Sequence, residues 1–298
     1  MATVLEKRIK KLLDDITDLA MKNEPEAVVK RYKDYDLFIV NKEFSSFAGR
    51  WFGPRIDDKD KTKYRRPYIE VYNLSRGASE TAGTLLHELS HQVDYVRHGD
   101  TGHQKPFYEA YAQLIYASLD LGILSRKDYE SLEWGSDKNK VMAIVNRYEP
   151  HPVKYSMNDV MIIKAYNCYD QKEELKKRGY GWNAIELSWE KEAEDLEAEE
   201  RYLRGLGAIR VNAGVKEKRF HYTTEKYSMY VDAIAYIEAI GETYAKKEDL
   251  KKRGFVFNQA RKSWVLRTKT SVVKKMMEEL SSDANYEGII FKTMKVNK

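Results

Sequence analysis

The chain has 298 residues, of which 42% are hydrophobic and 33% charged. This composition is typical of a folded globular protein and excludes a largely disordered chain. No apolar run approaches the length that spans a bilayer, and the length accommodates two ordinary domains. The net charge of +5 arises in residues 151–298, which hold 28 Lys and Arg against 23 Asp and Glu. An excess spread so thinly is typical of solvated surface.

Targeting and redox features are sparse. The first 35 residues never run far without a charge, so they lack the apolar core of a signal peptide. The single cysteine, Cys168, cannot form an internal disulfide, which fits a reducing compartment. We therefore expect a cytoplasmic protein that does not associate with a membrane.

The first part of the chain predicts two helices followed by three strands. Apolar residues recur at helical spacing over residues 4–19, and a second short helix is expected over 25–35. Short runs of β-branched and aromatic residues then predict strands, at residues 36–42, 49–54 and 67–74. The charged segment 55–66 breaks the pattern and predicts a solvent-exposed loop or hairpin end.

Two further helices complete this part. Ser79 is a candidate N-cap for a helix over residues 81–98, and another helix is expected over 105–121, ending at Gly122. Helix, strands and helices in this order predict an α+β fold. We assign residues 1–135 to this domain and the breaker-rich segment 136–153 to a linker.

The remainder of the chain repeats itself. The 23 residues from Tyr169 align without a gap on those from Tyr244, and Lys-Tyr-Ser-Met occurs upstream of both, at Lys154 and Lys226. This predicts a duplicated α+β unit at residues 154–225 and 226–298. Each unit is expected to contain a strand, a helix ending in glycine, a strand pair between two aromatic positions and a second helix.

Four of the six histidines lie between Thr84 and Phe107. His87 and His91 are four residues apart on a predicted helix, so both rings project from one face and reach one ion. Glu88 follows the first histidine and points to the side, where it can touch a water on that ion. This His-Glu-x-x-His spacing is that of a zinc hydrolase, in which the glutamate is the general base.

A catalytic zinc takes three protein ligands and leaves one position open for water. His98 lies about 10 Å further along the helix axis, too far to share the ion on a straight helix. His103, beyond a turn bracketed by two glycines, is the better candidate. Asp94 and Asp100 remain as alternative ligands.

The segment "TLLHELSHQVDY" followed by "TGHQKPFYEAY" resembles the SprT/Spartan family of zinc metallopeptidases, over about residues 1–130. That family has a histidine four residues before a phenylalanine, here His103 and Phe107. Gln104 stands where the family usually has glycine, and one cysteine cannot build the zinc ribbon that some members carry. The resemblance implies a zincin-like fold with one Zn²⁺, and a protease whose relatives include enzymes that degrade proteins crosslinked to DNA.

Two basic clusters occupy matching positions in the repeat, at Lys176, Lys177 and Arg178 and at Lys251, Lys252 and Arg253. Basic residues at helix C-termini are favoured by the macrodipole, which accounts for them structurally. Beside Trp182, Trp189, Phe257 and Trp264 they could also bind a nucleic acid. Recruitment of a protein partner is the alternative role.

Two functions follow from the sequence. The first is a zinc metalloendopeptidase acting on a protein substrate, with DNA as a second partner through the repeats. The alternative is an inactive, zinc-stabilised binding or inhibitor protein that recruits a protein or a nucleic acid. Glu88 separates them, because a binding protein needs no base there. The oligomeric state is left open.

Overall fold

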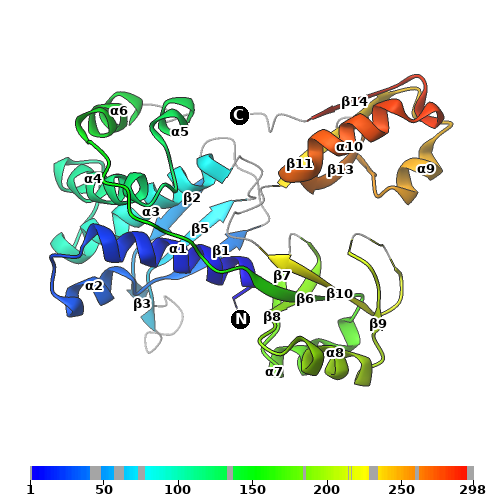
Figure 1. Ribbon diagram of the computed structural model, residues 1–298, viewed down its shortest axis with the longest axis horizontal. Coiled ribbons are helices and arrows are strands. Elements are labelled where there is room, and N and C mark those ends of the chain that lie inside the picture. Colours follow the sequence, from blue (N-terminus) through cyan, green and yellow to red (C-terminus); the bar gives the residue numbers. More distant parts are fainter. Residues whose placement is uncertain are drawn as a thin grey trace.

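A computed structural model describes residues 2–40, 48–56, 64–72, 78–132, 137–183, 186–213, 215, 217–227, 234–258 and 262–293. Among these residues, buried apolar side chains form three separate clusters, within residues 9–145, 163–222 and 237–291. No helix among them is long and apolar enough to cross a membrane. The described residues therefore form an α+β structure, whose helices and strands are shown in Figure 1, with three buried apolar clusters.

The first core lies between a small sheet and several helices. Its helices are α1 (Val4–Ala20), α2 (Glu26–Tyr32), α3 (Ala78–His98), α4 (Lys105–Asp120), α5 (Arg126–Ser131) and α6 (Lys138–Arg147). Its strands are β1 (Asp36–Val40), β2 (Gly49–Phe52) and β5 (Tyr68–Tyr72), and a hairpin is formed by β3 (Arg55–Ile56) and β4 (Tyr64–Arg65). The three predicted strands are confirmed, although positions 41, 42, 73 and 74 lie outside the described residues.

β5 is the central strand of the first sheet. It pairs with β1 in parallel and with β2 in antiparallel orientation, so Ile69 stands between Leu37 and Trp51. Ile69 is fully buried. α3 packs against β2 and β5, and α4 packs against α3 and α1 (Figure 1). The sheet thus places the edge strand β2 along the helix that carries the paired histidines.

The start of α1 joins the first core to the first repeat. Thr3 and Glu6 form a capping box, and Glu6 Oε1 also accepts a hydrogen bond from the Ile39 backbone at 2.8 Å. Glu190 of the repeat accepts a hydrogen bond from the Val4 backbone at 2.8 Å. A Cβ on Gly181 would lie 2.6 Å from the carbonyl oxygen of Ala2, so only glycine permits this approach.

The two predicted repeats have similar orders of elements, and the first has one more strand, β9, among the described residues. The first has β6 (Val160–Tyr166), α7 (Lys172–Lys177), β7 (Gly181–Asn183), β8 (Ser188–Glu192), α8 (Leu196–Gly205), β9 (Ile209–Arg210) and β10 (His221–Tyr227). The second has β11 (Ile234–Gly241), α9 (Lys247–Lys252), β12 (Val256–Asn258), β13 (Ser263–Lys269), α10 (Thr270–Ser282) and β14 (Ile289–Thr293). Strand order is β7-β8-β6-β10-β9 in one sheet and β12-β13-β11-β14 in the other. Gly179 and Gly254 follow the first helix of each repeat with φ of 94° and 92°.

Three predicted boundaries are wrong. α3 begins at Ala78, so Ser79 lies inside it and donates to Asp128 at 2.8 Å instead of capping. The predicted second helix over 25–35 ends at Tyr32. The unit boundary between residues 225 and 226 falls within β10, which pairs with β6 as far as Tyr227.

The predicted linker at 136–153 is also corrected. It contains α6, whose Val141 and Val145 are fully buried in the first core. The segment predicted a linker because breaker residues flank the helix, and the role of its short apolar run shows only when it packs against the core.

We expect Val141→Ala to lower the free energy of unfolding by about 2 kcal/mol, because it removes buried methyl groups and leaves a cavity. Asn146→Ala, at an exposed position of the same helix, is the control and should change stability little. Chemical denaturation of the two variants tests this. Equal stability would show that α6 is not part of the core.

Candidate metal centre

α3 presents two faces with different chemistry. The face that enters the core carries apolar residues that are at most 1% exposed: Leu85, Leu86, Leu89 and Val93. His87 and His91 lie one turn apart on another face, and their ring centroids are 5.2 Å apart. The four-residue spacing therefore does bring both imidazoles to one place.

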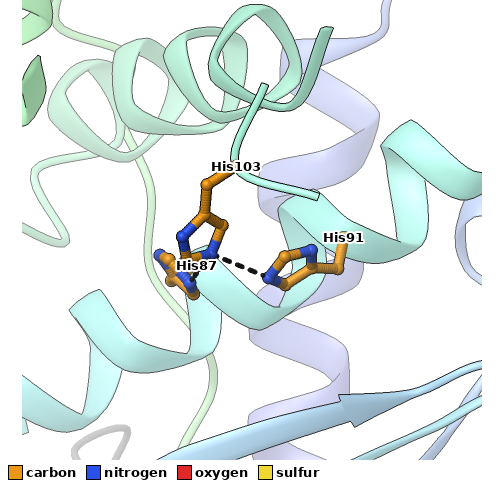
Figure 2. Close-up of side chains that lie close together, drawn as sticks. All are labelled: His87, His91 and His103. Atoms are coloured by element: carbon orange, nitrogen blue, oxygen red, sulfur yellow. Dashed lines mark hydrogen bonds between the residues drawn. The ribbon is translucent and has the colours of Figure 1, made fainter. Parts of the chain in front are cut away.

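His103 approaches this pair from the chain segment after α3. The helix ends at His98 and is followed by Gly99, whose φ of 79° is in the left-handed region, and His103 lies two residues before α4. Its Nε2 is 3.0 Å from Nε2 of His87 and 3.3 Å from Nε2 of His91 (Figure 2). Two nitrogens bound tetrahedrally to zinc at about 2.0–2.1 Å stand roughly 3.3 Å apart. The three nitrogens therefore fit one metal ion.

Phe107 forms an apolar contact shared by the three histidines. It is fully buried, and its ring centroid lies 5.0, 4.5 and 4.8 Å from those of His87, His91 and His103. Burial, followed by the neighbouring imidazoles, lowers the pKa of His87 to about 4 and that of His91 to about 3. Both rings are therefore neutral near pH 7, which is the form that binds a metal.

Glu88 is buried next to the histidines and held by β2. Its Oε2 accepts a hydrogen bond from the Trp51 backbone at 2.7 Å. Burial raises the pKa of Glu88 to about 7, against the lowering effects of the Trp51 N–H and the Arg50 charge. A Cβ on Gly49 would lie 2.7 Å from Thr84 and 3.2 Å from Glu88 side-chain atoms. Glycine there allows β2 to approach α3.

Trp51 is a site residue that sequence reasoning missed. Its Nε1 donates to Gln92 at 3.0 Å, and its ring stacks on His91 with centroids 6.2 Å apart. The Gln92 amide in turn donates to the Arg31 carbonyl at 3.2 Å. No local pattern indicated these contacts, because Trp51 and α3 meet only when β2 joins the sheet.

Polar groups stand behind two of the three rings. Thr101 Oγ1 lies 3.0 Å from Nδ1 of His91. Asp137 Oδ2 lies 3.7 Å from Nδ1 of His103, and its Oδ1 accepts a hydrogen bond from the Tyr108 hydroxyl at 2.8 Å. Such partners orient metal-binding histidines and raise their basicity. Asp137 was missed because it lay in the segment predicted as a linker.

The alternative ligands lie elsewhere. Nδ1 of His98 is 2.9 Å from Oδ1 of the buried Asp94, so these two residues pair with each other. Asp100 accepts a hydrogen bond from the Thr101 backbone at 2.8 Å. Within the described part of the chain, the metal-ligand cluster consists of His87, His91 and His103.

The two basic clusters of the repeats are already ion-paired. The four lysines pair with acidic residues of their own helices, in the pairs Lys176–Glu173, Lys177–Glu174, Lys251–Glu248 and Lys252–Asp249. Arg178 pairs with Glu199 and lies over the Tyr202 ring, and Arg253 pairs with Asp283 and lies over Tyr286. These contacts turn the two arginines toward their own repeats.

The matching aromatic positions differ in exposure. Trp182 and Phe257 are 43% and 45% exposed, whereas Trp264 is only 7% exposed and belongs to the third core. If the repeats bind a nucleic acid as predicted, the lysines and the exposed Trp182 and Phe257 are better placed to contact it than the arginines.

Comparison with known proteins adds no family assignment. A scan against protein-family models, a search of curated proteins and a search of solved structures each return no match. The functional argument therefore depends on the residues of this chain.

We expect the purified protein to bind one zinc ion, and His87→Ala, His91→Ala and His103→Ala each to lose it, because a mononuclear site with three protein ligands does not tolerate removal of one. His98→Ala is the matched control and should retain the metal. Elemental analysis of the dialysed proteins measures this. Full zinc content in His103→Ala would contradict its assignment.

Asp137→Asn should weaken zinc binding about 10-fold, because the amide keeps the size of the side chain but removes its charge from His103. Competition with a chromophoric chelator gives the affinity. Glu109→Gln, at an exposed position of α4, controls for loss of one charge. An unchanged affinity in Asp137→Asn would show that the 3.7 Å contact does not support the ligand.

Proposed function

We propose that the protein is a zinc-dependent metalloprotease in which His87, His91 and His103 bind the ion and Glu88 is the general base. The convergence of three imidazole Nε2 atoms beside a buried carboxylate carries this proposal. The resemblance of Thr84–Phe107 to the SprT/Spartan family supports it. We propose a zincin-like fold for the first core on the same ground.

The residues around the cluster have the roles that peptide hydrolysis requires. When bound, zinc would polarise the scissile carbonyl and acidify the attacking water. Glu88 would accept the proton from that water and pass it to the leaving amine. Its Oε2 is fixed by Trp51, and its Oε1 has no hydrogen bond to the rest of the described structure, which leaves this oxygen for the proton transfer.

The composition of the cluster favours an enzyme over a zinc-stabilised binding protein. Structural zinc sites are closed by four protein ligands, whereas catalytic sites have three and an open position. Three ligand residues are grouped in the described chain. A binding role would also leave the burial of Glu88 beside the ligands without a purpose, since burying a carboxylate is costly.

The substrate is proposed to be a protein, and by the family resemblance one associated with DNA. The single cysteine does not offer a second catalytic centre, because Cys168 is buried and its burial raises the pKa of the thiol to about 12. A cytoplasmic location stays a prediction.

Glu88→Gln should keep its zinc and its fold but lower the rate of peptide cleavage by at least about 100-fold, because the amide cannot accept a proton. Cleavage of a denatured model protein, and of the chain itself, is followed on gels with and without added DNA. Zinc content is measured on the same samples.

Glu80→Gln is the matched control, since it makes the same change two turns earlier on α3. It should retain full activity. Cleavage by Glu88→Gln at the original rate would exclude Glu88 as the base. Zinc-loaded protein that cleaves nothing in either assay would favour the binding protein.

A further inference from the structure

Each repeat carries a row of aromatic and lysine side chains in which exposed residues contact an inner tryptophan. Strip 1 consists of Tyr169, Lys172, Lys176, Trp189 and Trp182, and strip 2 consists of Tyr244, Lys247, Lys251, Trp264 and Phe257. The outer aromatics are well exposed: Tyr169 by 76%, Tyr244 by 81%, Trp182 by 43% and Phe257 by 45%. Large aromatic side chains at these exposures contribute little to the cores of their own repeats.

The contacts within the two strips correspond one to one. Lys172 Nζ lies 4.2 Å from the ring centroid of Tyr169, and Lys247 Nζ lies 4.7 Å from that of Tyr244. Nζ of Lys176 and Nζ of Lys251 each lie 6.0 Å from the ring of the inner tryptophan. The ring centroid of that tryptophan lies 5.5 Å from that of Trp182 in strip 1 and 5.4 Å from that of Phe257 in strip 2.

On the sheet face away from the strips, the two repeats differ in their side chains. Ala165 pairs with Trp189 in the first sheet, and Ala239 pairs with Trp264 in the second, so the two alanines correspond. The residues before them, Lys164 and Glu238, therefore correspond as well. Lys164 pairs with Glu186 and Glu225, whereas Glu238 pairs with Lys292. The charge at this position is therefore reversed between repeats. Packing explains the shared inner tryptophans, but it does not explain why exposed aromatics persist while a buried charge changes sign.

Charge along the strips favours an anionic partner. α7 and the residue after it carry four basic and two acidic side chains, and the same holds for α9. Lys176 and Lys251 are about half exposed, and their ion pairs with Glu173 and Glu248 are of the surface kind that contributes little stability. A phosphate can therefore replace the carboxylate at low cost.

We propose that strips 1 and 2 bind single-stranded nucleic acid, with bases stacked on Tyr169, Trp182, Tyr244 and Phe257 and phosphates held by the neighbouring lysines. Aromatic faces beside lysines are the arrangement that binds unpaired strands without reading their sequence. A duplex hides the faces of its bases, so it does not offer them to these rings. The inference concerns residues remote in sequence from the histidines and does not depend on the protease proposal.

Fluorescence anisotropy of labelled oligo(dT), titrated with the full chain at low salt, tests the proposal. We expect saturable binding that weakens steeply with added salt, because bound phosphates release counterions. A duplex of equal length should bind more weakly. Tyr169→Ala combined with Trp182→Ala should lower the affinity for oligo(dT) about 10-fold or more, as should Tyr244→Ala combined with Phe257→Ala.

Matched controls separate stacking from charge and from folding. Phe38→Ala removes an aromatic that is 41% exposed in β1 and should leave binding unchanged. Lys172→Glu with Lys247→Glu should weaken binding, whereas Lys105→Glu, on α4, should not. Thermal melting of each variant reports the fold. Absence of oligo(dT) binding at low salt would overturn the proposal, and so would full binding by both double aromatic variants or tighter binding of the duplex.

Discussion

Three imidazole nitrogens that face one another at the edge of the first core are the constraint on which the proposed site depends. Nε2 of His103 lies within 3.3 Å of Nε2 of both His87 and His91, and Phe107 covers the group. If all three rings were neutral, at most some of these contacts could be hydrogen bonds, and protonated rings would repel one another. A single cation satisfies all three lone pairs at once. The arrangement is thus stable as a ligand set and poor as a hydrogen-bonded network.

The proposed ligand set and the residues that hold it come from four separate parts of the first core. α3 supplies two histidines, and the segment before α4 supplies the third. β2 fixes Glu88 through the Trp51 backbone, and the residue preceding α6 supplies Asp137. Because these groups meet only in the folded chain, binding of a metal would also stabilise the fold. The polar residues behind the ligands are therefore as much a part of the centre as the ligands themselves.

The repeats show how one frame can support two different surfaces. In both repeats a short helix, α7 or α9, is followed by a glycine of positive φ and then by a pair of antiparallel strands. One face keeps its aromatic and lysine residues in both copies. The other differs, and in the first repeat Glu190 accepts a hydrogen bond from the start of α1. Val265 occupies the matching position of the second repeat and has no carboxylate with which to make that contact.

The sequence pattern was sufficient to predict features that depend on a single helix or turn. The spacing of His87 and His91 placed them on one helical face, and the glycines at 99 and 102 indicated a turn that returns His103. Apolar periodicity located α1. The internal alignment indicated two similar units; four strands have the same order in both sheets, and β9 is present in the first sheet alone among the described residues, while the duplication itself stays a prediction.

Tertiary structure decided what depends on contacts between distant segments. Trp51 meets Glu88 because β2 pairs with β5, and Asp137 meets His103 because Val141 and Val145 draw α6 into the core. The sequence around α6 resembled a linker, since breaker residues flank the helix and the role of its buried valines shows only against a partner surface. By itself, the sequence determined which residues share a helix face. Which carboxylate, hydroxyl or indole stands behind them was decided by packing, because side chains far apart in the chain leave no periodic signal of their contact.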